Sequence, residues 1–459
     1  MNVVNSDLLR DEATYCSFGD TVHYLEPPKI FSRCAGSWLF DEADRAYLDL
    51  QMWYSACNFG YANPRLNAAL KRQIDTLPQL ASQYLHREKI ELAKTIAQNV
   101  ERTFGVKGRV HFNVGGSQSI EDSLKLVRNA CGGKSLMFAF EGGYHGRTLG
   151  ASSITSSYRY RRRYGHFGER AQFIPFPYCF RCPYGKQKAD CGLYCVEQFA
   201  RLFDTEYYGV WDAKHGSAEY AAFYIEAVQG TGGYVIPPEG YFARLQSILA
   251  ERHILLVDDE IQMGFYRTGT FWAIENFGIV PDVIVFGKAM TNGMNPLAGL
   301  WAREALITPE LFPPGSTHST FAANPLGTAV ALEAIQMMGE QDYTAMTRRK
   351  GAYLLEGLRD LQRRHAIIGD VDGLGMALRM EICAPDGFTP DKATTDRLFE
   401  EGMKGDLESG DQRYGLVLDI GGYYKNVVTL APSLEISQAE MDLALVLLDQ
   451  LLLRVTKKS

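Results

Sequence analysis

The sequence lacks any apolar run long enough to cross a membrane. A membrane-spanning helix needs roughly 18–20 consecutive apolar residues, and the nearest candidate, LALVLLDQLLL near the C-terminus, is shorter and is interrupted by Asp449 and Gln450. An amphipathic packing helix explains this segment better. The first residues, MNVVNSDLLRDEATY, also lack the basic and then apolar pattern of a signal peptide. We therefore expect a cytoplasmic protein with no membrane partner.

Excess positive charge is absent as well. Lysine and arginine total 47 against 54 aspartates and glutamates, so the 459-residue chain has a formal net charge of −7. Such a chain is poorly suited to bind the phosphate backbone of nucleic acids. The basic and aromatic run YRYRRRYGHFGER at 158–170 is able to stack on bases, but it is more typical of a solvated helix face or a subunit contact. We expect no nucleic-acid partner.

Disulfides are not expected, because nine cysteines in a reducing compartment should be free thiols or metal ligands. Four of them follow the spacing C-x2-C-x8-C-x3-C within an insert at 177–195: Cys179, Cys182, Cys191 and Cys195. Four thiolates at this spacing are able to hold a structural zinc ion, although the C-x3-C half is unusual for a zinc knuckle. The alternative is a surface elaboration without metal. We assign no metal to catalysis.

The pattern of predicted strands and helices along the chain indicates two domains of unequal size. The N-terminal stretch WLFDEADRAYLDLQMWYSACNFGYANP is typical of short strands and turns, and a helix is predicted at 88–100. From about residue 109, short apolar runs such as SLMFAF, AAFYIEAV, HILLVDDE and DVIVFGK alternate with helical segments. Such runs predict parallel strands that are covered on both faces in an α/β domain. A long helix at 325–339 precedes helices on a small mixed sheet. We predict domains at 1–57, 58–338 and 339–459, the first and last forming one small domain.

Two apolar runs end in chemically reactive side chains. ILLVDDEIQMG ends a predicted strand with Asp258, Asp259 and Glu260, which alone would also suit solvated carboxylates or a divalent metal. PDVIVFGKAMTNG places Lys288 after another strand, where lysine usually faces solvent. Together, a lysine amine and an upstream acid suit pyridoxal 5'-phosphate, which needs a lysine for its aldehyde and an acid beside its pyridinium nitrogen.

Two glycine-containing turns could complete such a site. HFNVGGSQSIEDSLKLV predicts a strand, the turn at Gly116 and Ser117, and a helix whose N-terminus would attract a phosphate. FEGGYHGRTLG carries Tyr144 and His145, which are suited to cover an aromatic ring, and Arg147, which is suited to bind a carboxylate. Each residue also has an ordinary structural explanation: a core tyrosine, a hydrogen-bonded histidine or a surface arginine. Their order along the chain is the stronger signal.

This order resembles that of class III aminotransferases, which are fold-type I pyridoxal-phosphate enzymes, from YLDLQMWYSACNFGYANP to VVTLAPSLEIS. The most specific stretch is LLVDDEIQMGFYRTGTFWAIENFGIVPDVIVFGKAMTNGMNPLAG. The resemblance implies a large domain with a mainly parallel seven-stranded-type sheet between helices, and a small α+β domain from both termini. It also implies that Asp259, not Asp258, is the partner of the pyridinium nitrogen and that Lys288 is the Schiff-base lysine.

The same resemblance assigns the remaining positions of the site. Gly116 and Ser117 match the phosphate turn, and Tyr144 with His145 match the pair that stacks on the ring. Ile261 would pack behind the ring and Gln262 would reach its phenolic oxygen. The other two assignments imply a shared site and a substrate pocket: Thr320 in THSTFAANP would reach the cofactor phosphate of a neighbouring subunit, and Trp53 would line the pocket. A homodimer, or a tetramer of two such dimers, is therefore expected.

Departures from the family pattern narrow the substrate. Members that use glutamate carry an arginine for the α-carboxylate where this chain has Thr429, and a glutamate where it has Thr231. The arginine and the glutamate are expected to be lost together, because either charge alone would be buried without a partner, which costs free energy. Arg147 resembles the arginine that binds the far carboxylate in 4-aminobutyrate- and ornithine-type enzymes, and Lys425 is a candidate substitute charge.

These features predict an aminotransferase that moves an amino group from an ω-amino acid, diamine or related amine to a 2-oxo acid such as pyruvate. Lys288 would remove and return the proton as general base and then acid, with ping-pong kinetics. The alternative is a pyridoxal-phosphate-dependent amino-acid racemase or epimerase of the same family.

Overall fold

The computed structural model describes residues 3–19, 28–162, 164 and 171–456. The second half of the basic run at 158–170 therefore lies largely outside the described residues. In the part of the chain that is described, no helix is both long enough and apolar enough to span a membrane.

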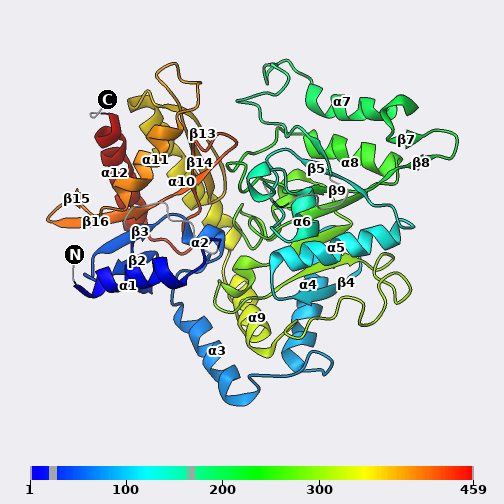
Figure 1. Cartoon of the computed structure of the whole chain (residues 1–459), viewed down its shortest axis with the longest axis horizontal. Coiled ribbons are helices and arrows are strands. Elements are labelled where there is room, and N and C mark those ends of the chain that lie inside the picture. Colours follow the sequence, from blue (N-terminus) through cyan, green and yellow to red (C-terminus); the bar gives the residue numbers. More distant parts are fainter. Residues whose placement is uncertain (1–2, 20–27, 163, 165–170, 457–459) are drawn as a thin grey trace.

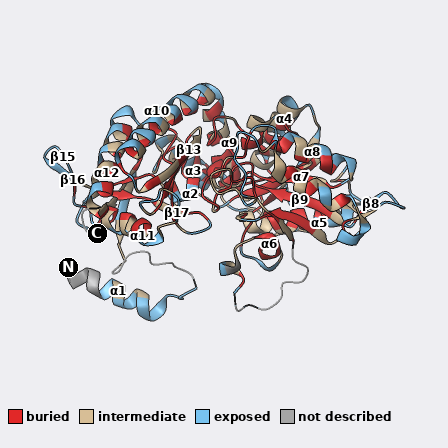
Figure 2. Ribbon diagram, turned by 90° about the horizontal axis from the view of Figure 1, so that it is seen from above, coloured by how far each residue is buried: buried red, intermediate tan, exposed pale blue. Residues whose placement is uncertain are grey.

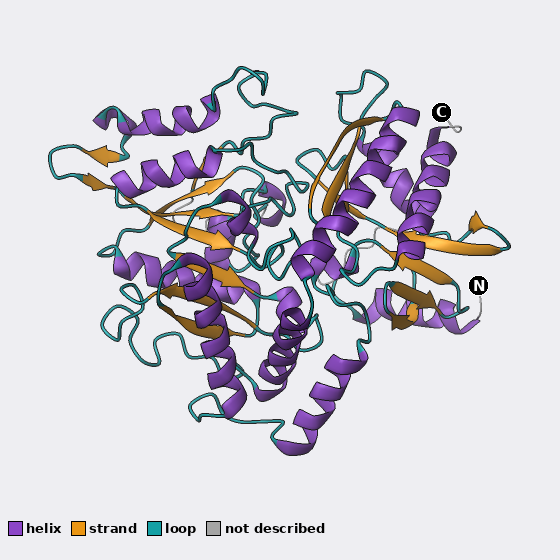
Figure 3. Cartoon of the chain, turned by 180° about the vertical axis from the view of Figure 1, so that it is seen from behind, coloured by secondary structure: helices purple, strands orange, loops and turns teal. Residues whose placement is uncertain are grey.

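A seven-stranded sheet forms the centre of the larger part of the molecule, in the order β4-β12-β11-β10-β9-β5-β6. Its neighbouring strands are parallel except around β12, which is antiparallel to both β11 and β4. Helices lie on both faces of this sheet (Figures 1 and 3). The bounds of its strands are β4 Gly108–Asn113, β5 Leu136–Phe140, β6 Gln172–Ile174, β9 Tyr220–Ile225, β10 Leu255–Asp259, β11 Val283–Phe286 and β12 Ala298–Arg303.

Alternate residues of these strands enter two different hydrophobic cores. Leu256 and Ile284 belong to one core, whereas Val257 and Val283 belong to the other. Both faces of the sheet are therefore buried, as the continuous apolar runs predict, because side chains of a strand alternate between its two faces. Burial is accordingly greatest in the middle of this part (Figure 2). Strands β5, β9, β10 and β11 confirm the predicted runs, and the mainly parallel seven-stranded sheet between helices confirms the predicted architecture of the large domain.

Strand β12 was not predicted, and its direction follows from the chain before it. A parallel return requires a crossover of about a dozen residues or more, usually a helix. The segment between β11 and β12 instead makes one short 3₁₀ turn, η5 (Lys288–Thr291), and reverses directly. The lysine predicted for the site is the first residue of that turn.

The two ends of the chain meet in the smaller part of the molecule, on the same side in Figure 1. The prediction of one small mixed sheet is wrong, because two sheets form there. One is a five-stranded sheet in which β3 pairs in parallel with β16, and the other is a four-stranded antiparallel sheet in the order β13-β14-β18-β17. Two sheets form because the N-terminal strands pair with β16, whereas, among the described strands, β13, β14, β17 and β18 pair only with one another. The domain borders near residues 57 and 338 stay predictions.

The remaining strands are short. Those of the two smaller sheets are β1 Phe31–Ala35, β2 Trp38–Asp41, β3 Ala46–Asp49, β13 Ile368–Leu374, β14 Ala377–Ile382, β15 Leu407–Ser409, β16 Gln412–Val417, β17 Asp419–Gly421 and β18 Val427–Leu430. A separate hairpin pairs β7 Trp211–Asp212 with β8 Ser217–Ala218.

Several helices begin at a capping side chain. Asn63 and Asn324 each accept backbone hydrogen bonds at the start of a helix whose first residue is proline, a favourable first position. The second of these, α9, confirms the long helix predicted at 325–339. The α-helices are α1 Val3–Tyr15, α2 Met52–Ser55, α3 Pro64–Thr76, α4 Arg87–Phe104, α5 Gly116–Ala130, α6 Leu149–Ile154, α7 Tyr194–Ala200, α8 Tyr241–Glu251, α9 Pro325–Glu340, α10 Tyr343–Arg364, α11 Lys392–Gly402 and α12 Gln438–Thr456. Further 3₁₀ turns are η1 Tyr158–Tyr160, η2 Arg201–Phe203, η3 Glu206–Tyr208 and η4 Ala273–Phe277.

The cysteine-bearing insert at 177–195 consists mainly of turns and leads into α7. All four of its cysteines are partly buried free thiols. Within the described residues, no three histidine, cysteine, aspartate or glutamate side chains are grouped so as to hold a metal ion. The geometry thus gives the zinc interpretation no support, and the insert must be explained by what its other residues contact.

Candidate active site

The carboxyl ends of β10 and β11 bring Asp259 and Lys288 to one edge of the central sheet. Asp259 is the last residue of β10 and pairs in register with Val285 of the neighbouring parallel strand. Lys288 follows that strand after a single glycine, with a left-handed φ of 41°. Open α/β sheets place their ligand sites at this edge. Burial lowers the pKa of Lys288, although Asp259, Glu226 and Asp419 favour its charged form.

A cavity of about 320 Å³ opens between these two residues. Nearly all the residues predicted for cofactor and substrate contact line it together. Those residues are Trp53, Gly116, Ser117, Tyr144, His145, Asp259, Ile261, Gln262 and Lys288. The structure therefore brings together residues from five separate segments of the sequence. Arg147 lies outside this cavity, in an adjoining one.

Asp259 is held by a buried histidine. The Nδ1 of His145 lies 2.8 Å from Asp259 Oδ2, and the backbone N–H of Ile261 donates to Oδ1 at 3.1 Å. Burial opposes a charge on His145, but the hydrogen bond to Asp259 and the charges of Asp259 and Glu226 raise its pKa overall. His145 was predicted to stack on a ring beside Tyr144. The stacking stays a prediction, whereas the observed hydrogen bond shows that His145 orients the Asp259 carboxylate.

Glu226 belongs to this site but was not predicted. It follows β9 directly, and its carboxylate accepts hydrogen bonds from the backbone N–H groups of Tyr144 and Gly230, both at 2.9 Å. Burial raises its pKa to about 7. An acid at the end of an apolar strand was the signal that found Asp259, so the same criterion applied to AAFYIE would have found Glu226.

The turn before α5 offers backbone N–H groups to a ligand. No side chain caps this helix, so its first N–H groups are free to bind a phosphate. Close packing explains Gly116 of this turn and Gly146 of the adjacent loop that carries Tyr144: a Cβ on Gly116 would lie 2.7 Å from Ile261 Cδ1, and one on Gly146 would lie 2.3 Å from Ser117 Oγ. The turn can pack this closely on its neighbours only because both side chains are absent.

A second compartment of about 240 Å³ adjoins the cavity and shares Lys288 with it. Three cationic side chains besides Lys288 line it, namely Arg147, Arg159 and Lys425, together with the carboxylate of Asp419. The Arg147 guanidinium lies over the ring of Tyr160, 4.5 Å from its centre. The compartment is therefore positively charged overall and suited to an anionic group of a substrate.

The two threonines that replace charged residues of related enzymes occupy different places. Thr231 lines the second compartment. Thr429 is buried in β18, where its hydroxyl donates to Asp419 at 2.9 Å. Neither position 231 nor position 429 carries a cation. A substrate carboxylate in this region must therefore be bound by another residue.

A left-handed turn places two aromatic side chains at the mouth of both spaces. All four residues of α2 have positive φ values of 45–66°. Each such residue costs about 1–2 kcal/mol in an L-amino acid, so the surroundings must hold the turn. Asp49 accepts from the N–H of Met52 at 2.8 Å, and Arg267 donates to Ser55 at 2.7 Å. The ring of Trp53 lines the cavity, and Tyr54 lines both spaces.

The family model for class-III aminotransferases matches residues 21–452. This chain belongs to the class-III aminotransferase family. An alanine/serine racemase of Pyrococcus horikoshii is 30% identical over 92% of this chain and 85% of its own length. An ornithine aminotransferase of Bordetella pertussis is 30% identical over 90% of this chain and 89% of its own. The crystal structure of an (S)-enantioselective ω-transaminase from Thermomicrobium roseum superposes with a TM-score of 0.84 at 25% identity, covering 98% of each chain.

Class-III aminotransferases depend on pyridoxal 5'-phosphate, and the described residues fit that group. When bound, it supplies an aldehyde for the amine and an electron-withdrawing ring. The uncapped N-terminus of α5 suits its phosphate, Asp259 suits its ring nitrogen and Lys288 suits its aldehyde. Nε2 of His145 is buried and has no hydrogen-bond partner among the described residues, which is consistent with a site that a ligand completes.

Thr320 is the one predicted cofactor residue that does not contribute to its own chain's cavity. It is exposed on the loop before α9 and lines neither space. This position is compatible with a contact to a neighbouring subunit, and that contact stays a prediction.

Proposed function

We propose that this class-III enzyme is an aminotransferase that takes an amino group from an ω-amino acid, diamine or related amine and gives it to a 2-oxo acid such as pyruvate. The observation that carries this proposal is the second compartment, whose cations lie beyond Lys288 rather than at position 429. A substrate that reacts through its distal amine would place that amine at Lys288 and its carboxylate in this compartment. Diamines would leave the cations unused but would still reach Lys288.

The proposed roles follow from the environment of each side chain. Lys288 needs a neutral amine to accept a proton, and burial lowers its pKa in that direction. Once protonated, Nζ is stabilised by nearby Asp259, Glu226 and Asp419, and it can return the proton to a different carbon. Asp259 would keep the ring nitrogen protonated, with His145 fixing the orientation of its carboxylate. Donor and acceptor would occupy the same site at Lys288 in turn, so ping-pong kinetics are expected.

A racemase or epimerase is the second candidate, because the Pyrococcus racemase is as similar to this chain as the ornithine aminotransferase is. A racemase would return the proton to the opposite face of the same carbon and would need no acceptor. It would also keep the donor nitrogen on the substrate. These differences make the two candidates separable by product.

The deciding experiment supplies the holoenzyme with 4-aminobutanoate and, separately, with L-alanine, each with and without a 2-oxo acid. From 4-aminobutanoate we expect amino-group transfer to pyruvate, measured as newly formed alanine by chromatography, only when the acceptor is also present. Sustained loss of optical rotation from L-alanine in the absence of acceptor would contradict the aminotransferase proposal. Weaker turnover is expected with 2-oxoglutarate than with pyruvate, because no arginine stands at position 429.

We also propose that the enzyme works in the cytoplasm as a homodimer, or as a tetramer of two such dimers, in which Thr320 reaches the partner's cofactor. Light scattering of the purified holoenzyme measures its mass. In Thr320→Val, weaker cofactor binding at unchanged mass is expected. A monomeric, fully active enzyme would contradict the shared site.

A further inference from the structure

Lys425 is presented to the second compartment by a constrained turn. It lies between β17 and β18, and its N–H donates to the carbonyl of Gly422 at 3.2 Å. Its φ of 57° is left-handed, which a lysine adopts only when the surroundings enforce it. The side chain is partly buried and lines the same space as Arg147 and Arg159.

The charge of Lys425 is not neutralised by an ion pair. Asp419 lies near enough to favour its charged form, but the Asp419 carboxylate already accepts hydrogen bonds from Thr429 at 2.9 Å and Gln51 at 3.4 Å. Among the described residues, no carboxylate forms an ion pair with the Lys425 amine. Burial therefore lowers its pKa, and an anion entering the compartment would relieve this cost.

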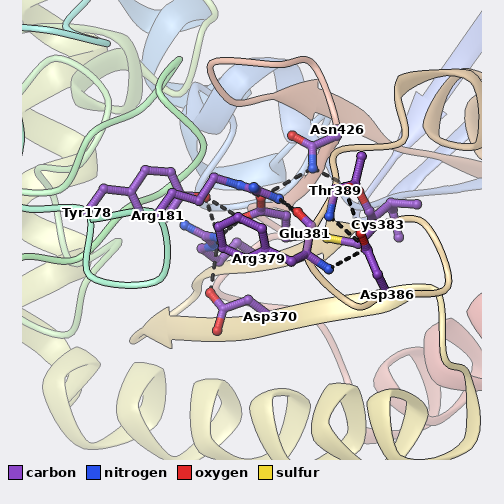
Figure 4. Close-up of polar contacts among 11 residues, drawn as sticks. Tyr178, Arg181, Asp370, Arg379, Glu381, Cys383, Asp386, Thr389 and Asn426 are labelled. Atoms are coloured by element: carbon purple, nitrogen blue, oxygen red, sulfur yellow. Dashed lines mark hydrogen bonds and ion pairs between the residues drawn. The ribbon is translucent and has the colours of Figure 1, made fainter. Parts of the chain in front are cut away.

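The residue after Lys425 is fixed by a buried network on β14, shown in Figure 4. Asn426 donates to the carboxylate of Glu381 at 3.2 Å. Two residues at the start of the cysteine-bearing insert, Tyr178 and Arg181, donate to the same carboxylate. Arg379, also on β14, donates to Glu381 and to the Tyr178 hydroxyl, the latter at 2.7 Å.

A second contact joins the insert to the same turn. The rings of Tyr178 and Tyr423 meet edge to face with centres 5.8 Å apart. The Tyr423 hydroxyl donates to the carbonyl of Glu141 at 2.7 Å, at the beginning of the segment that carries Tyr144. The turn is thus held on one side by the insert and on the other by the active-site loop of the large sheet.

We propose that Lys425 binds a carboxylate of the substrate, and that Tyr178 and Arg181 of the insert position it through Glu381 and Asn426. Lys425 replaces, from a different place in the fold, the cation that position 429 lacks. This inference rests on the proposed function for the identity of the substrate. It also explains the insert without metal: the insert sets the substrate pocket through its first turn, not through its thiols.

The first test compares Lys425→Met and Lys425→Arg with wild type in the holoenzyme. The paired donors are 4-aminobutanoate and butylamine, which differ in the carboxylate. We expect KM for 4-aminobutanoate to rise roughly tenfold or more in Lys425→Met, because a hydrogen bond to a charged group is lost. The KM for butylamine should stay unchanged, and Lys425→Arg should restore most of the loss. Lys392→Met is the matched control, since Lys392 is an exposed cation near Lys425 that does not line the compartment.

Calorimetric binding of pentanoate, which has no amine to react, separates this inference from the proposed function. If neither donor is converted but pentanoate binding still weakens in Lys425→Met, the proposed function fails and the carboxylate site stands. If both donors are converted and Lys425→Met changes neither their KM values nor pentanoate binding, the inference is wrong.

The second test addresses the positioning residues with Tyr178→Phe, which removes the hydroxyl between Arg379 and Glu381 but keeps the ring on Tyr423. We expect KM for 4-aminobutanoate to rise about two- to fivefold, less than in Lys425→Met because the cation itself remains. Butylamine KM and kcat should not change. Tyr194→Phe is the control, because Tyr194 lies in the same insert and contacts Tyr184 instead. Equal effects on both donors, or none on either, would overturn the positioning role.

Discussion

The cavity at Lys288 and the compartment at Lys425 share a wall but are built in different ways. The cavity is formed largely by residues at the ends of strands of a single sheet, so parallel strands and short turns place them together. The compartment gathers side chains from an active-site loop, a 3₁₀ turn and a turn between two strands of another sheet. The first arrangement follows from the large sheet, whereas the second depends on how the smaller part of the molecule meets the larger.

This difference predicts that changes in the cavity will affect all donors equally and that changes in the compartment will discriminate between them. Lys288→Ala should produce the largest effect. We expect kcat to fall by about 10³-fold or more for both 4-aminobutanoate and butylamine, because general base and acid are lost together. Borohydride should no longer trap the cofactor on the protein. A trapped adduct in Lys288→Ala, or a loss confined to one donor, would contradict the assignment.

A smaller effect is expected from Gly116→Ala. The new Cβ would lie 2.7 Å from Ile261 Cδ1, so the turn or that side chain must move. Such overpacking costs about 1–3 kcal/mol, and we expect the Kd for pyridoxal 5'-phosphate, measured by absorbance titration, to rise roughly tenfold.

Two matched variants sharpen this prediction. In Gly116→Ala combined with Ile261→Val, which lacks Cδ1, affinity should return towards wild type. Gly115→Ala is the control, because nothing lies within 4 Å of its added Cβ. If Gly115→Ala weakens cofactor binding as much as Gly116→Ala does, close packing on Ile261 is not the cause.

The smallest effect is a change in pH dependence from Glu226→Gln. Burial raises the pKa of Glu226 from its usual 4.5 to about 7 in the folded protein. Between these values the folded state holds a proton that the unfolded state releases, so this group makes stability fall as pH rises from 4.5 to 7. Above that range its full cost is present, and below it the cost disappears.

We expect Glu226→Gln to remove this contribution. The free energy of unfolding of the cofactor-free wild type, from urea titrations, should fall relative to the variant across that pH range. Glu251→Gln, on an exposed position at the end of α8, should track wild type throughout. Parallel curves for wild type and Glu226→Gln would show that Glu226 is not protonated in the folded state near neutral pH.

The cavity was more predictable than the compartment for a physical reason. Asp259 and Lys288 each follow an apolar strand, and such strands end at one edge when they run parallel. Local sequence therefore predicted that both residues lie at this edge, which the structure confirms. Glu226 satisfied the same criterion and was overlooked. The prediction for His145 missed its hydrogen bond to Asp259, because partners 114 residues apart leave no local signal.

The compartment depends on contacts that no local pattern contains. Lys425 could be named as a candidate charge, but its left-handed backbone and its place beside Arg147 and Arg159 depend on packing between separate segments. The four cysteines show the reverse case, in which a conspicuous sequence pattern did not identify the residues that make the contacts. Their spacing was the most conspicuous pattern in the insert, yet the neighbouring Tyr178 and Arg181 make the contacts that join it to the rest of the molecule.

The sequence by itself determined the alternating strands and helices, the lysine and acid at the strand ends, and the glycine turn before α5. These are properties of short segments, where apolar periodicity and backbone freedom act locally. Only the tertiary structure decided the separation of the two smaller sheets and the set of cations around the second compartment. Those features arise where segments far apart in the chain bury charge and surface against one another, and that free energy exists only once the chain has folded.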